Sequence, residues 1–348
     1  MRLLSWIAFI AISEVGAELL SVTAGIAVFL SGGTFWHFKD YIKCKLYECC
    51  KDEHVSLNAY KLEQDLSELL FGQHLVKTTL VNAVREHWRK SIPEKPLVMS
   101  FHGYTGCGKN YVAEIIANST YKNGMRSPFV HHLVATADYP DKSKMEQYQS
   151  ELRERIIQSV KKCPRSLFII DETDKLPEKL LSAIKPFLDY YTTVSGIDFR
   201  KATFLFLSNK GGSAIAELTV NNYLAGKPRE ELQLKDFERV VMGHAYNEAG
   251  GLKMSELISN HLIDHFIPFL PLQREHVRKC VESYLKRRGH EYLIDKDGLV
   301  DRVLGSLQYF PDDTKSFSSS GCKRVSAKAD LEISVHGKHT LMQFDDEL

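Results

Sequence analysis

The sequence predicts an α/β fold, in which helices cover a parallel sheet, followed by a small domain made of helices. Between residues 96 and 272, short apolar runs alternate with segments in which apolar residues recur at helical spacing. Continuous apolar runs of this length are typical of strands buried on both faces of a parallel sheet. After Pro271 the strand-like runs stop and amphipathic helices follow, so we place a domain boundary there.

Five apolar runs are the expected strands of the sheet. The first leads directly into a glycine-rich loop, and the third and fourth end in polar side chains. The runs are PLVMSFHG (96–103), FVHHLVATAD (129–138), SLFIIDE (166–172), TFLFLSN (203–209) and HFIPFLPL (265–272).

Helical spacing marks the segments between and after these runs. In the sheet domain we expect helices over 109–119 and 144–162, and in the small domain over 274–289 and 296–310. No strand is expected between the helices of the small domain. The patterns thus predict a sheet domain over residues 55–271 and a helical domain over 272–328.

Length and composition suit a globular protein of two domains. The chain has 348 residues, of which 44% are hydrophobic and 26% are charged, as in ordinary folded proteins. Lys and Arg number 45 against 44 Asp and Glu, which gives a formal net charge of +1. There is no long basic run, so the clustered positive surface that nucleic acid binding requires is not expected. We predict no nucleic acid partner.

The N-terminus has the pattern of a secretory signal peptide, expected over residues 1–17. One Arg precedes an apolar run from Leu3 to Ile12, and small residues follow, as a cleavage site requires; an uncleaved anchor is the alternative. A second hydrophobic segment, residues 18–38, ends in a Gly pair and an aromatic cluster. This favours a segment lying at a membrane interface, hence peripheral membrane association, although a transmembrane helix running to about Phe38 is also compatible.

The C-terminal tail, residues 329–348, ends in the four residues DDEL. This ending resembles the K-D-E-L and H-D-E-L retrieval signals of the endoplasmic reticulum lumen and differs from both at its first position. The signal peptide and the tail support each other. We therefore expect a protein of the endoplasmic reticulum lumen.

Cysteine usage agrees only in part with that compartment, and a single glycosylation sequon is weak support for it. An odd number of cysteines leaves at least one thiol free or paired with another chain, and the absence of a C-x-x-C pair argues against a zinc site. The sequon Asn118-Ser119-Thr120 makes Asn118 a candidate glycosylation site if its helix end is exposed. The seven cysteines are Cys44, Cys49, Cys50, Cys107, Cys163, Cys280 and Cys322.

The glycine-rich loop GYTGCGKN follows the first expected strand and precedes a helix. It fits the phosphate-loop pattern G-x-x-x-x-G-K except that Asn110 replaces the usual Ser or Thr. Backbone N–H groups and the helix dipole favour phosphate there, and Lys109 would neutralise the β/γ-phosphates. The dipole also predicts a lowered pKa for Cys107, whose alternative role is a small filler. The expected nucleotide contacts are Gly103, Tyr104, Thr105, Gly106, Cys107, Gly108, Lys109 and Asn110.

Acids and an amide end the next strands. Asp171 stands where a magnesium-holding acid sits in nucleotide-hydrolysing proteins of this class, and Glu172 could deprotonate the attacking water. Asn209 could hold that water or the γ-phosphate, and Lys323 of the helical domain could reach over the phosphates. Each of them alone is also typical of a turn or an exposed loop. Together they predict ATP and Mg²⁺ as cofactors.

These elements, in this order, resemble the AAA+ ATPases, and the flanking words resemble the torsin family in particular. The resemblance runs from about residue 40 to about residue 325. LFGQHL (70–75) resembles the adenine-pocket segment of Clp-type members, and the torsin-like words are KCKLYECC (43–50), GKN in the loop, IKPFLDYY (184–191), FIPFLPL (266–272) and GCK (321–323).

The resemblance implies a role for each site residue. Asn110 would be a normal phosphate contact beside Lys109, because torsins carry Asn at this position. The other implied roles are Asp171 as the acid that holds Mg²⁺ through water, Glu172 as the catalytic base, Asn209 as the first sensor and Lys323 as the second. The implied disulfides are Cys44–Cys163 and Cys280–Cys322. The second adjoins Lys323 and could be a redox switch or an ordinary stabilising bridge.

One absence suggests a partner. Clp-type ATPases carry N-R-I-D before the last strand, and its Arg enters the neighbouring subunit's site. Here Leu262 stands at that position. Losing such an arginine typically costs about 10³-fold or more in turnover, so a homo-oligomer of this chain should hydrolyse ATP poorly. The torsin resemblance implies a membrane-anchored activator whose luminal domain docks and supplies the Arg.

The leading functional hypothesis is an ATPase, weak without its activator, that remodels protein complexes or membrane-linked structures. It would act in the endoplasmic reticulum lumen or the perinuclear space of the nuclear envelope. The alternative is a nucleotide-gated scaffold or chaperone with negligible hydrolysis. A small-molecule kinase is disfavoured by the helical domain and by Glu172, which suits attack by water. The sequence also leaves open whether Tyr139 is a substrate-threading residue.

Overall fold

The computed structural model describes residues 44–345 with the exception of residue 297. The expected signal peptide (1–17), the expected interfacial segment (18–38) and the last three residues of the DDEL sequence lie outside the described residues. Among the helices that are described, none has both the length and the apolar character needed to cross a membrane. The chain divides after His54 into a short N-terminal unit and a large compact unit that begins at Val55.

The N-terminal unit contains a disulfide between Cys44 and Cys49, whose Cα atoms are 5.3 Å apart. The pairing of Cys44 with Cys163 implied by the resemblance is therefore wrong. A helical turn at residues 44–46 followed by a bend brings the two cysteines together, within the usual range of about 4.4–6.8 Å for disulfides. Cys163 is itself disulfide-bonded in this structure.

The large unit is built on a parallel sheet, as the sequence predicts. Within the described residues the strand order is β2-β3-β4-β1-β5, and every neighbouring pair is parallel. The pairing of His102 with Ser208 and of Val134 with Asp171 aligns the carboxyl ends of the strands at one edge of the sheet. The strands are β1 Leu97–Gly103, β2 Val130–Val134, β3 Leu167–Asp171, β4 Thr203–Ser208 and β5 His265–Phe269.

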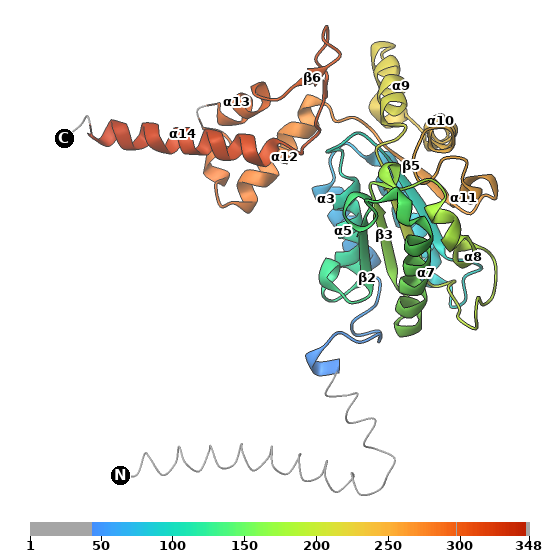
Figure 1. The fold of residues 1–348 in the computed structure, drawn as a ribbon. Helices are drawn as coiled ribbons and strands as arrows, with labels where there is room; N and C mark the ends of the chain where they lie inside the picture. The colour runs from blue at the N-terminus through green and yellow to red at the C-terminus, as the bar shows by residue number, and fades with distance from the viewer. Residues whose placement is uncertain (1–43, 297, 346–348) are drawn as a thin grey trace, which may run out of the picture. The chain divides into compact units, whose positions relative to one another are not determined.

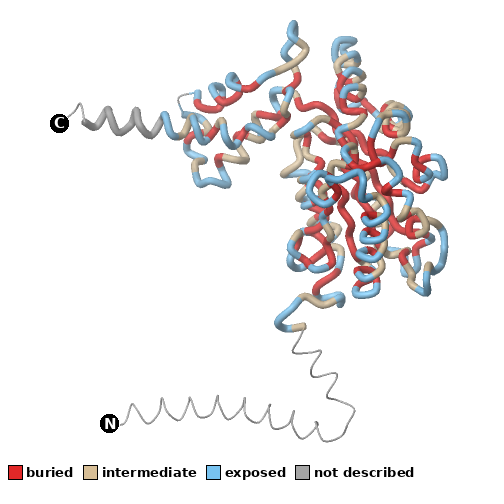
Figure 2. The backbone as a smooth tube through the Cα atoms, viewed as in Figure 1, coloured by how far each residue is buried: buried red, intermediate tan, exposed pale blue. Residues whose placement is uncertain are grey.

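Helices cover both faces of this sheet, and the buried residues concentrate along it (Figures 1 and 2). One face packs against α3 Ala59–Leu69, α4 His74–Arg89 and α5 Lys109–Thr120. The other packs against α7 Met145–Lys162, α8 Lys185–Leu188, α10 Leu234–Asn247 and α11 Glu256–Ser259. The alternating strand residues divide between two cores, one on each face.

Short elements complete the sheet domain. The longest is α9 Gly212–Leu224, which contacts β1, β5 and α10. The others are α6 Ala135–Asp138 and the 3₁₀ turns η1 Gly124–Arg126, η2 Lys142–Lys144, η3 Thr173–Lys175, η4 Leu180–Ile184 and η5 Arg229–Glu231.

The second expected strand, 129–138, ends earlier than its composition indicates. β2 stops at Val134 and the next four residues form α6. The Asp138 carboxylate accepts a hydrogen bond from the Val134 N–H at 2.7 Å, which stabilises the start of the helical turn. A side chain-to-backbone bond therefore overrides the apolar pattern.

The helical domain has its own hydrophobic core, formed by α12 Arg274–Arg287, α13 Leu299–Gly305 and α14 Val325–Asp345, with the 3₁₀ turn η6 Glu291–Leu293. α14 continues past residue 328, into the segment expected to be a tail. The expectation of no strand is wrong, because β6 Tyr309–Phe310 pairs antiparallel with β7 Phe317–Ser318. Strands of two residues are too short to produce a period-2 pattern.

Candidate nucleotide site

The glycine-rich loop joins the end of β1 to the start of α5. Gly108 stands at the N-cap of α5 with φ 105°, and Lys109 is the first residue of the helix. Only glycine adopts such a left-handed conformation without strain. The loop therefore presents backbone N–H groups and a helix N-terminus at the carboxyl edge of the sheet, where α/β proteins bind ligands.

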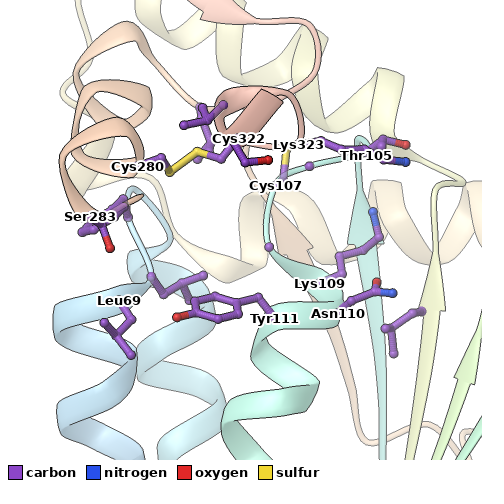
Figure 3. Close-up of a pocket in the computed structure, with 18 of the residues that line it drawn as sticks. Leu69, Thr105, Cys107, Lys109, Asn110, Tyr111, Cys280, Ser283, Cys322 and Lys323 are labelled. Atoms are coloured by element: carbon purple, nitrogen blue, oxygen red, sulfur yellow. A yellow bond between two sulfur atoms is a disulfide. The ribbon is translucent and has the colours of Figure 1, made fainter. Parts of the chain in front are cut away.

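A cavity of about 540 Å³ opens over this loop. Its walls come from the loop, from the end of α3, from the carboxyl ends of β3 and β4, and from α12 and α14 of the helical domain. Figure 3 shows the Cys280–Cys322 disulfide near the loop. The expected site residues that line the cavity are Thr105, Gly106, Cys107, Gly108, Lys109, Asn110, Asp171, Glu172, Asn209 and Lys323.

Gly103 and Tyr104 are the two expected contacts that do not line this cavity. Their carbonyl oxygens instead accept hydrogen bonds from the Lys109 ammonium, at 2.7 Å and 3.0 Å. The Tyr104 ring packs edge-on against Phe310 of the helical domain, with ring centroids 5.9 Å apart. Both residues thus shape the loop and hold its lysine.

Lys109 is 7% exposed, and its third hydrogen bond goes to the Asn209 side-chain oxygen at 3.0 Å. Burial lowers the pKa of Lys109 to about 8, although Asp171 and Asp174 oppose this shift. All three ammonium donors have acceptors, which limits the cost of burying the charge. Lys109 and Asn209, 100 positions apart in the sequence, are therefore joined by a hydrogen bond in the wall of the cavity.

Asn110 stands where the usual phosphate loop has a hydroxyl, and it contacts the acid at the end of β3. Its amide nitrogen donates a hydrogen bond to Asp171 Oδ2 at 2.5 Å. Burial by itself opposes ionisation of Asp171, but hydrogen bonds from His132, the Glu172 N–H and Asn110 lower its pKa. An ionised carboxylate is the kind of oxygen ligand that Mg²⁺ prefers, so Asp171 fits this ion.

Glu172 is held by a residue that sequence reasoning missed. The Thr136 hydroxyl donates a hydrogen bond to Glu172 Oε2 at 2.5 Å. Glu172 itself has left-handed backbone angles, with φ 53° and ψ 40°, a strained conformation typical of functional positions. The pairing of β2 with β3 carries Thr136 to the strand end beside Asp171. A correct strand register would have been needed to find it.

The helical domain reaches the loop through a close backbone contact. The Cys322 N–H donates a hydrogen bond to the Gly106 carbonyl at 3.1 Å, and a Cβ on Gly106 would lie 1.9 Å from the Ser320 carbonyl oxygen. Only glycine fits there. The disulfide Cys280–Cys322 is present as the resemblance implied, and it fixes this contact segment to α12, next to Lys323.

Gln73 is a second residue that the sequence reasoning did not single out. It is buried, and its amide nitrogen donates to the carbonyls of Cys107 at 3.1 Å and Leu270 at 2.8 Å. Its side-chain oxygen accepts from the Leu270 N–H at 2.9 Å. Gln73 therefore joins the phosphate loop to the end of β5. The word LFGQHL was its only signal in the sequence.

Comparison with known proteins agrees with this geometry. The family described as Torsin matches residues 44–170, and the family described as Torsin-1A, C-terminal domain matches residues 272–331. A torsin-like protein of Caenorhabditis elegans is 59% identical over 341 residues, covering 96% of each chain. The chain belongs to the torsin family. A torsin-like protein of Drosophila melanogaster is 39% identical over 85% of this torsin and 88% of its own length.

Solved structures confirm the AAA+ fold of this torsin. The Saccharomyces cerevisiae Hsp104–ADP complex matches with a TM-score of 0.54 and 20% identity over 83% of this chain. The S. cerevisiae Hsp104–casein complex in its extended conformation matches with a TM-score of 0.55, 20% identity and 87% coverage. This torsin spans about half the length of these structures, 49% and 50%. It is an AAA+ ATPase by family.

Leu262, at the position of the missing arginine, is 2% exposed and packs in the core on the α7 side of the sheet. Its carbonyl accepts a hydrogen bond from the buried ammonium of Lys95 at 2.9 Å, and Lys95 also pairs with Asp264 at 2.7 Å. A side chain that points into the core cannot enter another subunit's site. In this torsin, position 262 therefore supplies packing.

Three further residues singled out in the sequence, Cys107, Tyr139 and Asn118, have surroundings that bear on their expected roles. Cys107 is 1% exposed, and burial raises its pKa to about 11, so the predicted lowering by the helix dipole is wrong and the thiol is a filler. Tyr139 is buried edge-on against Tyr148, so its ring packs in the core in this structure. Asn118 is exposed near the end of α5, while the Thr120 hydroxyl of its sequon is buried.

Proposed function

We propose that this torsin hydrolyses ATP with Mg²⁺ when a membrane-anchored partner supplies an arginine, and that hydrolysis remodels protein complexes or membrane-linked structures. One observation carries the proposal. Lys109, Asp171 and Glu172 line one cavity, whereas Leu262 is buried in the core. The site therefore holds groups for binding and for activating water, and position 262 supplies none for the charge that develops on the transferred phosphoryl group.

The loop would bind the triphosphate through its backbone N–H groups and Lys109. The ammonium exchanges part of its contacts with loop carbonyls for phosphate oxygens, so its positive charge is balanced by a stronger acceptor. The chemistry that Mg²⁺ would supply, when bound, is positive charge that stabilises the phosphate oxygens. Asp171 would hold that ion through water, and Asn110 keeps the carboxylate ionised and fixed in direction.

Glu172 would accept the proton of the attacking water. Its carboxylate is bound by Thr136, so it must leave the hydroxyl before it can approach water near the γ-phosphate. Asn209 lies beside Lys109 and orients the water or the γ-phosphate through its amide. This arrangement makes release of Glu172 a step that precedes proton transfer.

The partner is proposed from the missing cation. A transition-state arginine typically contributes about 10³- to 10⁵-fold to turnover in phosphoryl transfer. A partner with a luminal domain beside the cavity can provide it in trans, anchored by its own membrane segment. Association of this torsin with itself is compatible with the same fold but would leave position 262 without a cation.

The compartment is proposed from the termini and the disulfides. Bridges at Cys44–Cys49 and Cys280–Cys322 are typical of proteins in an oxidising environment. Together with the signal pattern and the DDEL ending, they favour the endoplasmic reticulum lumen and the perinuclear space. The hydrophobic segment at 18–38 would hold the protein against the membrane that carries its partner.

The test measures ATP turnover of the full chain with and without luminal domains of candidate membrane partners. We expect low basal turnover and a rise of about 10³-fold with the correct partner. Replacing the partner's arginine by Ala should abolish the rise, and so should Glu172→Gln in the torsin. If no partner raises turnover and Glu172→Gln equals the wild type, the enzyme proposal is wrong.

A second function is favoured by the Thr136–Glu172 bond. A site whose base is restrained and whose arginine is absent could serve as a nucleotide-gated scaffold, which binds partners in its ATP state and turns over negligibly. Under this function Lys109→Ala should abolish partner binding, while Glu172→Gln should leave both partner binding and remodelling unchanged. Loss of remodelling in Glu172→Gln favours the ATPase.

A further inference from the structure

A second cavity, of about 250 Å³, adjoins the nucleotide cavity. It is lined by residues of the segment 70–73, of the end of α3, of the start of α4, of η5 and of α12. Leu70 lines both cavities. None of the expected phosphate-loop contacts lines the second one, although Gly72, Gln73 and His74 of the word LFGQHL do. The phosphate loop therefore does not form it.

Its most unusual feature is the guanidinium of Arg229, a residue that is only 9% exposed. The group donates to the Gly72 carbonyl from Nε at 3.0 Å and Nη2 at 2.6 Å, and to the Pro271 carbonyl from Nη1 at 2.9 Å. No carboxylate of the described residues pairs with it. Burial lowers the pKa of Arg229 to about 10, so it stays charged at neutral pH. Buried charges are normally paired.

The rest of the lining is also basic. Lys77 of α4 and Lys279 of α12 both line the cavity, and Lys279 is exposed. Glu230 is the single acidic residue among the lining residues. Three permanent cations outnumber the carboxylates of Glu230 and of nearby Glu275, both of which act on Arg229. Burial keeps the lining residue His276 neutral, with a pKa of about 4, so the cavity is positive.

We propose that this cavity is an anion site for a compact phosphate group. Pockets for drug-sized ligands measure roughly 300–1,000 Å³, so a cavity of about 250 Å³ suits inorganic phosphate or a phosphomonoester. Arg229 would supply a fixed, planar donor at the base, and the lysines would close over the anion as point charges. The phosphate group belongs to a free metabolite or to a lipid headgroup.

An anion bound at this site should change the affinity of the protein for the nucleotide. Arg229 binds the carbonyl of Gly72, and the next residue, Gln73, binds the carbonyl of Cys107 in the phosphate loop. Pro271, the second acceptor of Arg229, precedes Leu272, which lines the nucleotide cavity. The anion and the nucleotide thus share two supports, and each should change the affinity of the other by the same factor.

The test titrates inorganic phosphate into the full chain by calorimetry, with the nucleotide site first saturated by a non-hydrolysable ATP analogue and Mg²⁺. We expect one further phosphate per chain. Lys77→Gln/Lys279→Gln should weaken it roughly ten-fold or more, because bonds from charged donors are the strong ones. The matched control is Lys90→Gln/Lys286→Gln, which should bind as the wild type does. It removes two exposed lysines outside the cavity, Lys90 directly after α4 and Lys286 on α12.

A second pair of variants removes negative charge, so the expected effect on phosphate affinity is an increase. Glu230→Gln removes the lining carboxylate and should tighten phosphate binding about three-fold or more, whereas Glu231→Gln, its exposed neighbour outside the lining, should not. The proposal is overturned if phosphate does not bind to the nucleotide-loaded protein, or if both double-lysine variants bind equally well. Equal affinities of Glu230→Gln and Glu231→Gln would also overturn it.

The source of the phosphate is separated by two further probes. A soluble inositol phosphate and phosphatidylcholine vesicles with or without phosphatidylinositol bisphosphate are each tested against the wild type and Lys77→Gln/Lys279→Gln. A lysine-dependent gain restricted to the vesicles assigns a lipid headgroup. A lysine-dependent gain with the soluble compound assigns a free metabolite. Binding of both probes that ignores the lysines overturns the proposal.

Discussion

The side-chain nitrogen of Asn110 lies 2.5 Å from Asp171 Oδ2. This bond joins the last residue of the phosphate loop to the acid at the end of β3. In the usual loop a hydroxyl binds the metal directly, whereas here an amide donates a hydrogen bond to the carboxylate proposed to hold it. Asn110, the residue that departs from the loop pattern, thus pairs with Asp171. Substitutions can test this pair.

Asn110→Asp should weaken Mg-ATP binding by about ten-fold or more, because it places a second carboxylate against Asp171 in a partly buried site. Asn110→Ser should be tolerated better, since its hydroxyl can bind the metal or Asp171. Binding of a fluorescent ATP analogue measures both. Asn118→Asp makes the same change at another exposed position of α5, one that does not line the cavity, and should have no effect. Equal affinities of the two Asp variants would contradict the assigned role.

Thr136→Val should raise basal ATP turnover by roughly two- to ten-fold, because one hydrogen bond that restrains Glu172 is lost. ATP affinity should stay unchanged, since Thr136 does not line the cavity. Steady-state turnover and nucleotide binding are measured together. Thr78→Val, on the surface of α4, is the control. A fall in turnover would mean that Thr136 supports Glu172 in catalysis instead of restraining it.

The strands and the loop could be predicted because each has a local signal. β1, β3 and β4 are continuous apolar runs, and Lys109, Asp171 and Asn209 follow at their ends. Thr136 and Gln73 could not be predicted. The role of Thr136 depends on which strands are neighbours, and that of Gln73 depends on a contact with Leu270, just after β5 and 197 positions away. The Cys44–Cys49 bridge likewise depends on a local bend, which no spacing rule specifies.

Leu262→Arg should not restore an arginine finger. The side chain would enter the core, and burying an unpaired charge should lower the free energy of unfolding by about 3 kcal/mol or more. Thermal denaturation should show a clear fall in Tm and no gain in turnover. The neighbouring His261→Arg, at an exposed residue, should leave Tm nearly unchanged. A stable Leu262→Arg protein with raised turnover would show that position 262 can reach a neighbour's site.

Loss of the Cys280–Cys322 bridge should weaken nucleotide binding several-fold, because the contact of Cys322 with Gly106 would no longer be fixed to α12. The variant Cys280→Ser/Cys322→Ser is compared with Cys44→Ser/Cys49→Ser, which removes a bridge in the N-terminal unit and should bind nucleotide normally. If the first variant loses only thermal stability, the bridge is structural. If it loses affinity at unchanged Tm, the bridge reports redox state to the site.

The affinity for nucleotide should depend on pH through the ionisation of Lys109. Its pKa is lowered to about 8 by burial, so the free protein carries the charge below pH 8 and loses it above. Bound phosphate favours the charged form and raises the pKa; above pH 8, binding must therefore take up a proton, and affinity should fall by up to about ten-fold per pH unit. Calorimetry between pH 7 and 9, in buffers of different ionisation enthalpy, measures both the affinity and the proton uptake. Lys109→Met should bind weakly at every pH without this slope, and a flat wild-type profile would mean that Lys109 remains charged over the whole range.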